Sequence, residues 1–417
     1  MSTVYVIWDD SHIWGLLLRR ALASFGIDHR LVQAQEIADG LLARKPCSVL
    51  LVPGGTAKRK QEALGRAGMD AIRHYVSGGG AYLGFCGGAG LGLAGKCGLG
   101  LCPWKRRGFA DRLQHFVSGH MEVRPAEGSD LVPEDLPQRP LVPVWWPARF
   151  DPQTGDDVRV LAEYRDTGPD FWIADLPLKD FPPRMLEDLE TRFKINVEPR
   201  FMVGQPVAVE GEFGGGRYVL SYSHLETPAS RDANRWLAHI LSSLGNFDPI
   251  PDEKTRVPAW PLDDIESNWP DGPEGFLLSG TRDKLRETIR IGESHLLLFR
   301  RNPWLLGWRR GIPGSNINSL YALACEAAHL PPSDAAREYL SGISGDFART
   351  VEEFCHGTAG YLMAERLAMT MSESANPIPP RELKARREAL FGPPMELGGL
   401  HGKLQVWLEE LIRLQLI

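Results

Sequence analysis

The sequence predicts a doubly wound α/β fold with a mostly parallel sheet over its first half, on two observations. Short runs of β-formers at 4–8, 29–33, 48–52 and 81–85 alternate with segments at 13–25, 37–44 and 62–76 whose apolar residues recur at helical spacing. Glycine clusters follow both kinds of element, as at 53–55 and 78–80. Strands separated by helices of this length favour right-handed βαβ units, and therefore a parallel sheet.

The character of the chain changes between about 102 and 200, where Pro, Trp and short strand-like runs are frequent. The runs at 114–123, 142–146, 158–164 and 171–174 predict antiparallel strands that decorate the parallel sheet. The α/β pattern then resumes. Strands at 207–212 and 217–222 are joined by a glycine turn, and a closing helix covers 230–244.

The second half of the chain predicts a separate, all-helical domain. A Pro-rich linker covers about 248–273, and no strand signal follows it. Helical patterns cover 280–299, 317–329, 335–340, 347–371, 381–391 and 400–416. We therefore expect an α/β domain at 1–247, the linker at 248–273, and the helical domain at 274–417.

Composition excludes several classes of protein. With 417 residues and a net charge of -6, the chain does not have the basic character of a nucleic-acid coat. Six scattered cysteines are too sparse for a disulfide scaffold, and the first ten residues have no signal-peptide pattern. The longest uncharged stretch, 75–95, is too rich in glycine for a membrane span. We expect a cytoplasmic protein with no metal and no cofactor.

The most informative segment is Gly84–Gly88, which places a cysteine directly after a strand. A nucleophile at such a position turns sharply into a helix, and this turn brings the residues two before and two after it close together. Gly84 and Gly88 supply the small residues that this turn needs. The helix that follows points its N-terminus at Cys86, which favours the reactive thiolate. A buried structural cysteine is the plainer alternative.

A base and an orienting carboxylate follow the last strand of the same α/β unit. On an extended segment, His224 and Glu226 lie on one side, so the carboxylate can hold the imidazole tautomer. The carboxyl ends of parallel strands share one edge, where Cys86 and His224 would meet. Backbone N–H groups of Gly55 and Gly87 could form an oxyanion hole there. A solvated pair on a loop is the alternative for the two side chains.

Further residues fall at the same sheet edge. Gly54 and Gly88 complete the two glycine turns, and Asp9 and Asp10 follow the first strand. For the two aspartates, helix capping is the first interpretation and substrate contact the second.

The segments 53–55 (PGG), 84–88 (GFCGG) and 224–226 (HLE) together resemble the class I glutamine amidotransferases, and most of all the amidotransferase-like domain at the N-terminus of biotin–protein ligases. The resemblance covers about residues 1–245. It implies a flavodoxin-like sheet, a Cys86–His224–Glu226 triad, and hydrolysis of a small amide or amino-acid-like substrate through a thioester. The glutamine that such enzymes commonly carry four residues after the nucleophile is replaced by Gly90. The motifs of a biotin ligase catalytic domain are absent from the sequence. The alternative is therefore a catalytically silent protein that holds a metabolite at the same crevice.

Other patterns leave alternatives open. Cys97 and Cys102 could bind zinc only with help from His115 and His120, which would point to opposite faces of a strand. Alternatively, one of these two cysteines could form a disulfide with an oxidised Cys86. The glycines at 90–95 fit close backbone packing better than a dinucleotide fingerprint.

Two groups of large side chains have both a structural and a functional interpretation. Trp145, Trp146 and Trp172 suit either core packing or the wall of a crevice. The arginines and lysine at 282–310, with Trp304 and Trp308 beside them, form either a solvated helix face or a docking surface for an acidic partner or a membrane surface.

Overall fold

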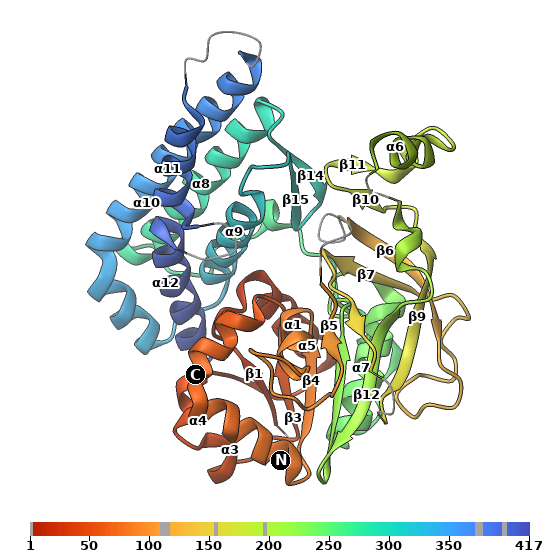
Figure 1. Ribbon diagram of the computed structural model, residues 1–417. Coiled ribbons are helices and arrows are strands. Elements are labelled where there is room, and N and C mark those ends of the chain that lie inside the picture. Colours follow the sequence, from red (N-terminus) through yellow and green to blue (C-terminus); the bar gives the residue numbers. More distant parts are fainter. Residues whose placement is uncertain (1–2, 109–116, 154–156, 195–197, 372–377, 394–397) are drawn as a thin grey trace. The chain divides into compact units, whose positions relative to one another are not determined.

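The computed structural model describes residues 3–108, 117–153, 157–194, 198–371, 378–393 and 398–417. The chain divides into two compact units, residues 1–259 and 260–417, so the division falls inside the Pro-rich segment. Figure 1 labels most of the elements of both units.

The first unit contains a sheet of eleven strands in the order β11-β10-β6-β9-β12-β13-β4-β3-β1-β2, with β7 paired to β6. Its parallel part consists of β1 (Val4–Ile7), β2 (His29–Val32), β3 (Val49–Val52), β4 (Ala81–Phe85) and β13 (Gly216–Ser221). These strands follow one another as 2-1-3-4-5, the flavodoxin-like order. The predicted doubly wound fold is confirmed.

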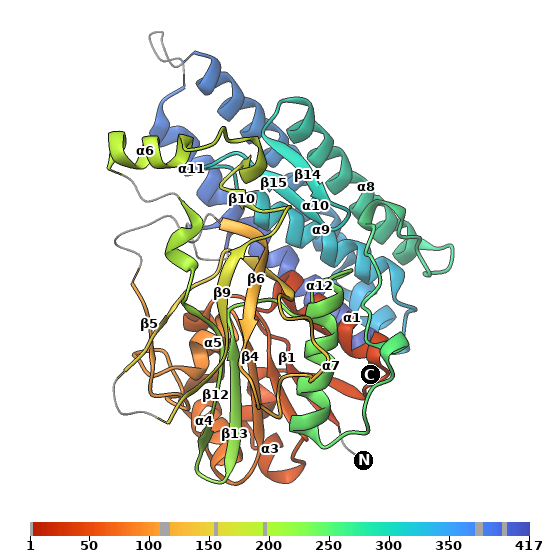
Figure 2. The same ribbon diagram turned by 90° about the vertical axis from the view of Figure 1, so that its right-hand side faces the viewer.

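Helices cover both faces of the parallel strands (Figure 2). The helices are α1 (His12–Phe25), α2 (Ala34–Ala38), α3 (Leu41–Arg44), α4 (Ala57–Ser77), α5 (Gly87–Gly92) and α7 (Arg231–Gly245). α4 and α5 lie on one face, and α1 and α7 lie on the other. The helix predicted at 37–44 is two short helices, because Gly40 adopts a left-handed φ of 87° between them.

The insertion adds antiparallel strands, most of which extend the same sheet. They are β5 (Lys105–Arg106), β6 (Val117–Pro125), β7 (Leu141–Trp145), β8 (Phe150–Asp151), β9 (Arg159–Thr167), β10 (Trp172–Ile173) and β11 (Leu176–Pro177). β9 pairs with β12 (Pro206–Phe213), which pairs with β13, while β5 and β8 form a separate ribbon. The insertion also contains α6 (Met185–Phe193), which was not predicted from the sequence; none of its residues is buried.

The second unit is mainly helical. Its helices are α8 (Pro273–Ser294), α9 (Gly314–His329), α10 (Asp334–Thr370), α11 (Pro380–Phe391) and α12 (Gly399–Gln415). The predicted helices at 335–340 and 347–371 are one continuous helix. The expectation that no strand follows the linker was wrong, because β14 (Leu298–Asn302) and β15 (Leu305–Trp308) form an antiparallel hairpin. Among the described residues, no helix is long and apolar enough to cross a membrane.

Candidate active site

Cys86 stands at the point where β4 turns into α5. Its φ of 48° and ψ of -101° lie outside the ordinary regions for a residue with a side chain, a strain of about 1–3 kcal/mol. Its N–H donates to the carbonyl of Ser221 at 2.8 Å, which ties the turn to the end of the neighbouring strand β13. The side chain is half-buried rather than enclosed in the core.

The turn is packed so closely that its glycines cannot be replaced. A Cβ on Gly84 would lie 2.6 Å from the carbonyl of Gly88, as expected for residues two before and two after the nucleophile. A Cβ on Gly87 would lie 2.1 Å from the carbonyl oxygen of Gly55, whose own φ is 109°. The two glycine turns therefore touch, and Gly55 and Gly87 are neighbours at the sheet edge.

The N–H groups of these glycines differ in what they bond. Gly88 donates to the carbonyl of Pro53 at 3.1 Å, so its N–H is already used. In the part of the chain that the structure describes, no acceptor is found for the N–H of Gly55 or of Gly87. The sequence predicts that these same two N–H groups form an oxyanion hole.

His224 and Glu226 form a fully buried pair beyond the end of β13. The Nδ1 atom of His224 lies 2.7 Å from Oε1 of Glu226, and both side chains have no exposed surface. The segment is a turn rather than the predicted extended stretch, since the N–H of Thr227 donates to the carbonyl of His224 at 3.1 Å. The pairing survives this difference because the turn folds both side chains inward.

Surrounding hydrogen bonds hold this turn in place. The Thr227 hydroxyl donates to the His224 carbonyl at 2.7 Å and accepts from Nε1 of Trp145 at 3.0 Å. From α7, Nδ2 of Asn234 donates to the carbonyls of Leu225 and Thr227, each at 2.8 Å. These bonds leave the imidazole little freedom to move away from Glu226.

The protonation of His224 is set by opposing effects. Burial lowers the pKa of the imidazole, whereas the charge of Glu226, the hydrogen bond to it and the nearby Cys86 raise that pKa to about 10. The Nε2 atom makes no hydrogen bond to any described residue. The raised pKa favours the protonated ring, whose Nε2–H can serve as a proton donor.

An aromatic wall covers the imidazole. The ring of Trp14, on α1, lies 4.3 Å from the His224 ring between centroids, and Trp146 meets Trp14 edge-on at 6.3 Å. Trp146 adopts a left-handed φ of 57°, and Trp145 is buried. Trp14 was not predicted from the sequence, where it has no signal beyond its place on the first helix. Trp172 lies on β10 and is half-buried.

Asp9 and Asp10 face the scaffold. Oδ2 of Asp9 accepts from the N–H of Ala34 at 2.6 Å, at the start of α2, and Oδ1 of Asp10 accepts from Arg59 at 2.9 Å. Nζ of the fully buried Lys60 donates to the main-chain carbonyls of both aspartates at 3.1 Å. Burial raises the pKa of both carboxyls, with Lys60 opposing it. For Asp9 the geometry matches the first interpretation, capping, although the capped helix is α2, whereas the Asp10 carboxylate pairs with the Arg59 side chain.

The remaining alternatives can be placed in part. His115 lies outside the described residues, and His120 bonds Asp170 and Ser230, each at 2.8 Å. Within the described residues, no three His, Cys, Asp or Glu side chains are grouped as metal ligands. In the 90–95 stretch, a Cβ on Gly92 would lie 2.5 Å from Leu220, consistent with close packing, whereas one on Gly90 would meet only Ala57 at 3.5 Å.

The basic segment of the second unit is extensively paired within that unit. Asp263 accepts from Arg300 at 3.1 Å, and Nε of Arg286 donates to the hydroxyl of Tyr321 at 3.1 Å. Lys284 pairs with Glu352. Trp304 is buried in the hairpin turn and Trp308 ends β15, so they do not share a helix face. These contacts favour a structural role for the segment.

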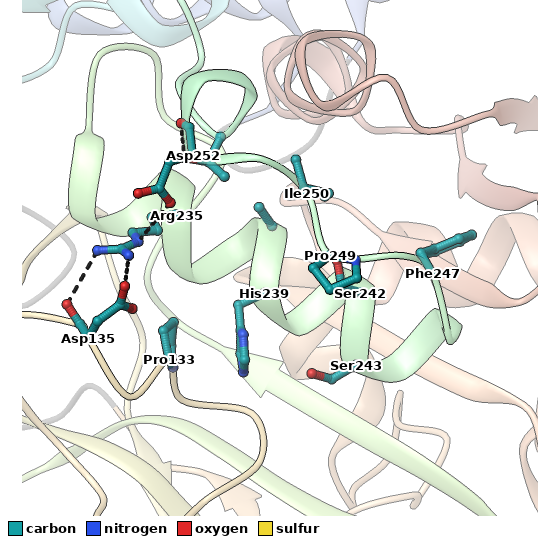
Figure 3. Close-up of a pocket in the computed structure, with 12 residues that line it drawn as sticks. Pro133, Asp135, Arg235, His239, Ser242, Ser243, Phe247, Pro249, Ile250 and Asp252 are labelled. Carbon is teal, nitrogen blue, oxygen red and sulfur yellow. Dashed lines mark hydrogen bonds and ion pairs between the residues drawn. The ribbon is translucent and has the colours of Figure 1, made fainter.

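A cavity of about 310 Å³ lies against the second half of α7 (Figure 3). Arg235 spans it to Asp135 and Asp252, and His239 and Ser242 also line it. None of the predicted site residues borders this cavity.

Comparison with known proteins gives a family match for part of the first unit. Residues 28–97 match a family described as biotin-protein ligase, N terminal, which confirms the predicted resemblance over that stretch. No curated protein matches the chain.

Solved structures of similar fold include a glutamine amidotransferase, at 19% identity and a TM-score of 0.37, with 58% of this chain and 98% of that chain covered. A glutamine amidotransferase from Thermotoga maritima has 11% identity and a TM-score of 0.34, covering 60% and 86%. A β-galactosidase from Rahnella sp. R3 has 12% identity and a TM-score of 0.36, covering 60% and 32%. At such low identity and TM-score, these likenesses support no conclusion about chemistry.

Proposed function

We propose that the first unit is a thiol-dependent amide hydrolase of the glutamine amidotransferase-like type, with Cys86 as nucleophile. The observation that carries the proposal is the buried His224–Glu226 pair, with Nδ1 and Oε1 at 2.7 Å, placed beyond the strand next to the one that bears the strained Cys86 turn. A nucleophile, a base and a group that orients the base are the parts such chemistry needs.

The proposed reaction follows from these positions. His224 holds the proton of the Cys86 thiol while the sulfur attacks the amide carbonyl carbon, and the N–H groups of Gly55 and Gly87 stabilise the resulting oxyanion. The imidazolium then gives that proton to the departing nitrogen as the C–N bond breaks, which leaves a thioester. Water, deprotonated by the neutral imidazole, hydrolyses the thioester and regenerates the thiol.

The electrostatics of His224 suit the step in which the amine leaves. An imidazolium with a raised pKa is a ready proton reservoir, and Glu226 holds its Nδ1–H so that Nε2 faces the reacting atoms. A nitrogen leaving group needs a proton in order to depart, so this step requires the protonated form of His224 beside the sulfur.

Intact-mass measurement with an electrophilic glutamine analogue tests the proposal. We expect one stoichiometric adduct, which peptide mapping places on Cys86, and ammonia release from at least one small amide. Cys86→Ala is the matched control, since the half-buried side chain allows a smaller residue. Equal labelling of wild type and Cys86→Ala would refute the proposal.

A silent binding protein is the second candidate, favoured by Gly90 in place of the common glutamine. In that case the crevice holds a metabolite without turnover. A thermal-shift screen separates the two: ligand stabilisation that persists unchanged in Cys86→Ala, with no ammonia release by wild type, supports the silent protein.

A further inference from the structure

A serine, a histidine and an aspartate from three segments of the first unit are linked by hydrogen bonds at a second place. Nε2 of His120, on β6, lies 2.8 Å from Oγ of Ser230, and Nδ1 of the same ring lies 2.8 Å from Oδ2 of Asp170. Ser230 directly precedes α7, and Asp170 lies between β9 and β10. The hydroxyl and the carboxylate therefore occupy the two ring nitrogens in the arrangement of a Ser–His–Asp triad.

Asp170 fixes both the position and the tautomer of the imidazole. Its Oδ1 atom accepts from the main-chain N–H of His120 at 2.9 Å, while Oδ2 faces Nδ1. An ionised carboxylate cannot donate a hydrogen bond, so Nδ1 carries the proton, and in the neutral ring Nε2 is left to accept from the Ser230 hydroxyl. The ring is thus oriented as a base towards Ser230.

Two glycines allow the loop that carries Asp170 to lie against β6. A Cβ on Gly119, whose φ is 131°, would lie 2.7 Å from the Asp170 carbonyl oxygen, and a Cβ on Gly168 would lie 2.7 Å from the His120 carbonyl oxygen. The N–H of Gly168 donates to that same His120 carbonyl at 2.7 Å. The backbone on both sides is therefore shaped for the contact between Asp170 and His120.

Ser230 stands at a position where serine ordinarily has another role. It is the N-cap residue of α7, where a serine hydroxyl usually accepts from an N–H of the first turn and stabilises the helix by about 1 kcal/mol. The Ser230 side chain makes no such bond, and its hydroxyl bonds His120 instead. By contrast, Ser333 at the N-cap of α10 does accept, from the N–H of Ala336 at 3.1 Å.

The start of α7 supplies hydrogen-bond donors next to this hydroxyl. In the part of the chain that the structure describes, no acceptor is found for the N–H of Arg231 or of Asp232, the first two residues of the helix. Ser230 is 5% exposed, but Ala229 before it and Arg231 after it are exposed. The hydroxyl therefore lies close to the surface, beside N–H groups that can stabilise an oxyanion.

We propose that Ser230, His120 and Asp170 form a second catalytic site, which hydrolyses carboxylic esters. His120 takes the Ser230 proton as Oγ bonds to the carbonyl carbon, and it gives that proton to the alcohol oxygen as the ester C–O bond breaks. Water then attacks the acyl-serine; His120 takes a proton from the water and passes it to Oγ as the acid is released. Asp170 is the positioning residue. An ester is the expected class, because an alcohol leaves more readily than an amine.

This activity goes beyond the one proposed for Cys86 and does not rest on it, although the two sites are neighbours. The Trp145 ring lies edge-on to the His120 ring at 6.4 Å between centroids, and its Nε1 donates to Thr227 in the turn that holds His224. A thiol can also react with esters, so the serine has to be examined in full-length Cys86→Ala.

Diisopropyl fluorophosphate provides the test, because an activated serine bonds to its phosphorus and fluoride leaves. We expect intact-mass measurement of Cys86→Ala to show one adduct, which peptide mapping places on Ser230, while Ser333 stays unlabelled as the control within the same molecule. His120→Gln in this background should slow the labelling of Ser230 by at least about 100-fold, the lower end of what a general base contributes. Labelling of Ser230 no faster than that of Ser333, or at the same rate in His120→Gln, would overturn the proposal.

Hydrolysis of p-nitrophenyl acetate is the second measurement, again in the Cys86→Ala background. Ser230→Ala should reduce the rate to that of the buffer, whereas Ser333→Ala should leave it unchanged. Asp170→Asn should lower the rate by at least about tenfold, and Asp170→Glu should restore part of it. Unchanged hydrolysis in Ser230→Ala would contradict the assignment. The labelling of Ser230 over Ser333 is read with the whole triad intact, so it decides the question even where a triad variant does not fold.

Discussion

Replacing Glu226 by glutamine should remove a pH dependence of stability that wild type shows. Glu226→Gln keeps the shape and an acceptor for Nδ1 but deletes the buried charge, which is the principal reason that the pKa of His224 rises to about 10. An ordinary histidine has a pKa of about 6.5. A group whose pKa is higher in the folded state contributes stability that is complete below about pH 6.5 and is lost as the pH rises towards 10.

The size of the effect follows from that difference. Each pH unit between 6.5 and 10 lowers the free energy of unfolding of wild type by about 1.4 kcal/mol, or about 5 kcal/mol across the range. In Glu226→Gln, burial is opposed only by Cys86, so the slope from this histidine nearly vanishes. At any one pH the variant can be more or less stable than wild type, since a buried ion pair also carries a desolvation cost. The slope is therefore the quantity to measure.

Urea unfolding of both proteins at intervals from pH 6 to pH 10 provides the test. We expect the difference in unfolding free energy between wild type and variant to change by about 4 kcal/mol from pH 6.5 to 9.5, in the direction that favours the variant at high pH. Titration of other groups cancels in this difference. Parallel curves for the two proteins would refute the buried, charged pair on which the site depends.

Three further predictions concern the scaffold, each measured by urea unfolding at pH 7. Gly88→Ala should lower the free energy of unfolding by more than about 3 kcal/mol, because its methyl would lie 2.0 Å from a carbonyl oxygen of β3. Gly90→Ala should be neutral or stabilise by about 0.5–1 kcal/mol, and equal effects of the two variants would contradict the packing described. Thr227→Val should cost about 1–2 kcal/mol, since it breaks both bonds of the hydroxyl, and an unchanged midpoint would mean that the turn is held otherwise. Lys60→Met should cost about 3 kcal/mol by stranding buried carbonyls, against about zero for the exposed Lys58→Met, and comparable values for the two would count against the assignment.

The parallel core and the cysteine turn at its edge could be predicted because both are encoded locally. Alternation of buried strands and amphipathic helices predicts the sheet, and the cysteine turn is marked by its glycines. The His224–Glu226 contact was predicted for the wrong local reason, since the segment is a turn. The two side chains still meet because a buried imidazole and a buried carboxylate each need a hydrogen-bond partner.

Other features depend on contacts that local patterns do not contain. The long helix α10 runs through Gly342 and Gly345 because it packs on α8 and α12, a tertiary contact that outweighs the low helix propensity of glycine. The helix predicted to reach 299 ends at Ser294, and Leu296 turns the chain at a φ of 57° into the β14–β15 hairpin. Trp14 reaches His224 only through the packing of α1 on the sheet.

The most direct test of the account is whether the Cys86 sulfur and the His224 imidazole act as one unit. Iodoacetamide alkylation rates of Cys86 and of Cys97, compared by mass spectrometry in wild type and in His224→Ala, measure this. We predict that Cys86 reacts at least tenfold faster than Cys97 at pH 7 in wild type, and that this advantage disappears in His224→Ala while the Cys97 rate stays the same. A Cys86 rate that does not respond to the loss of His224 would contradict the account.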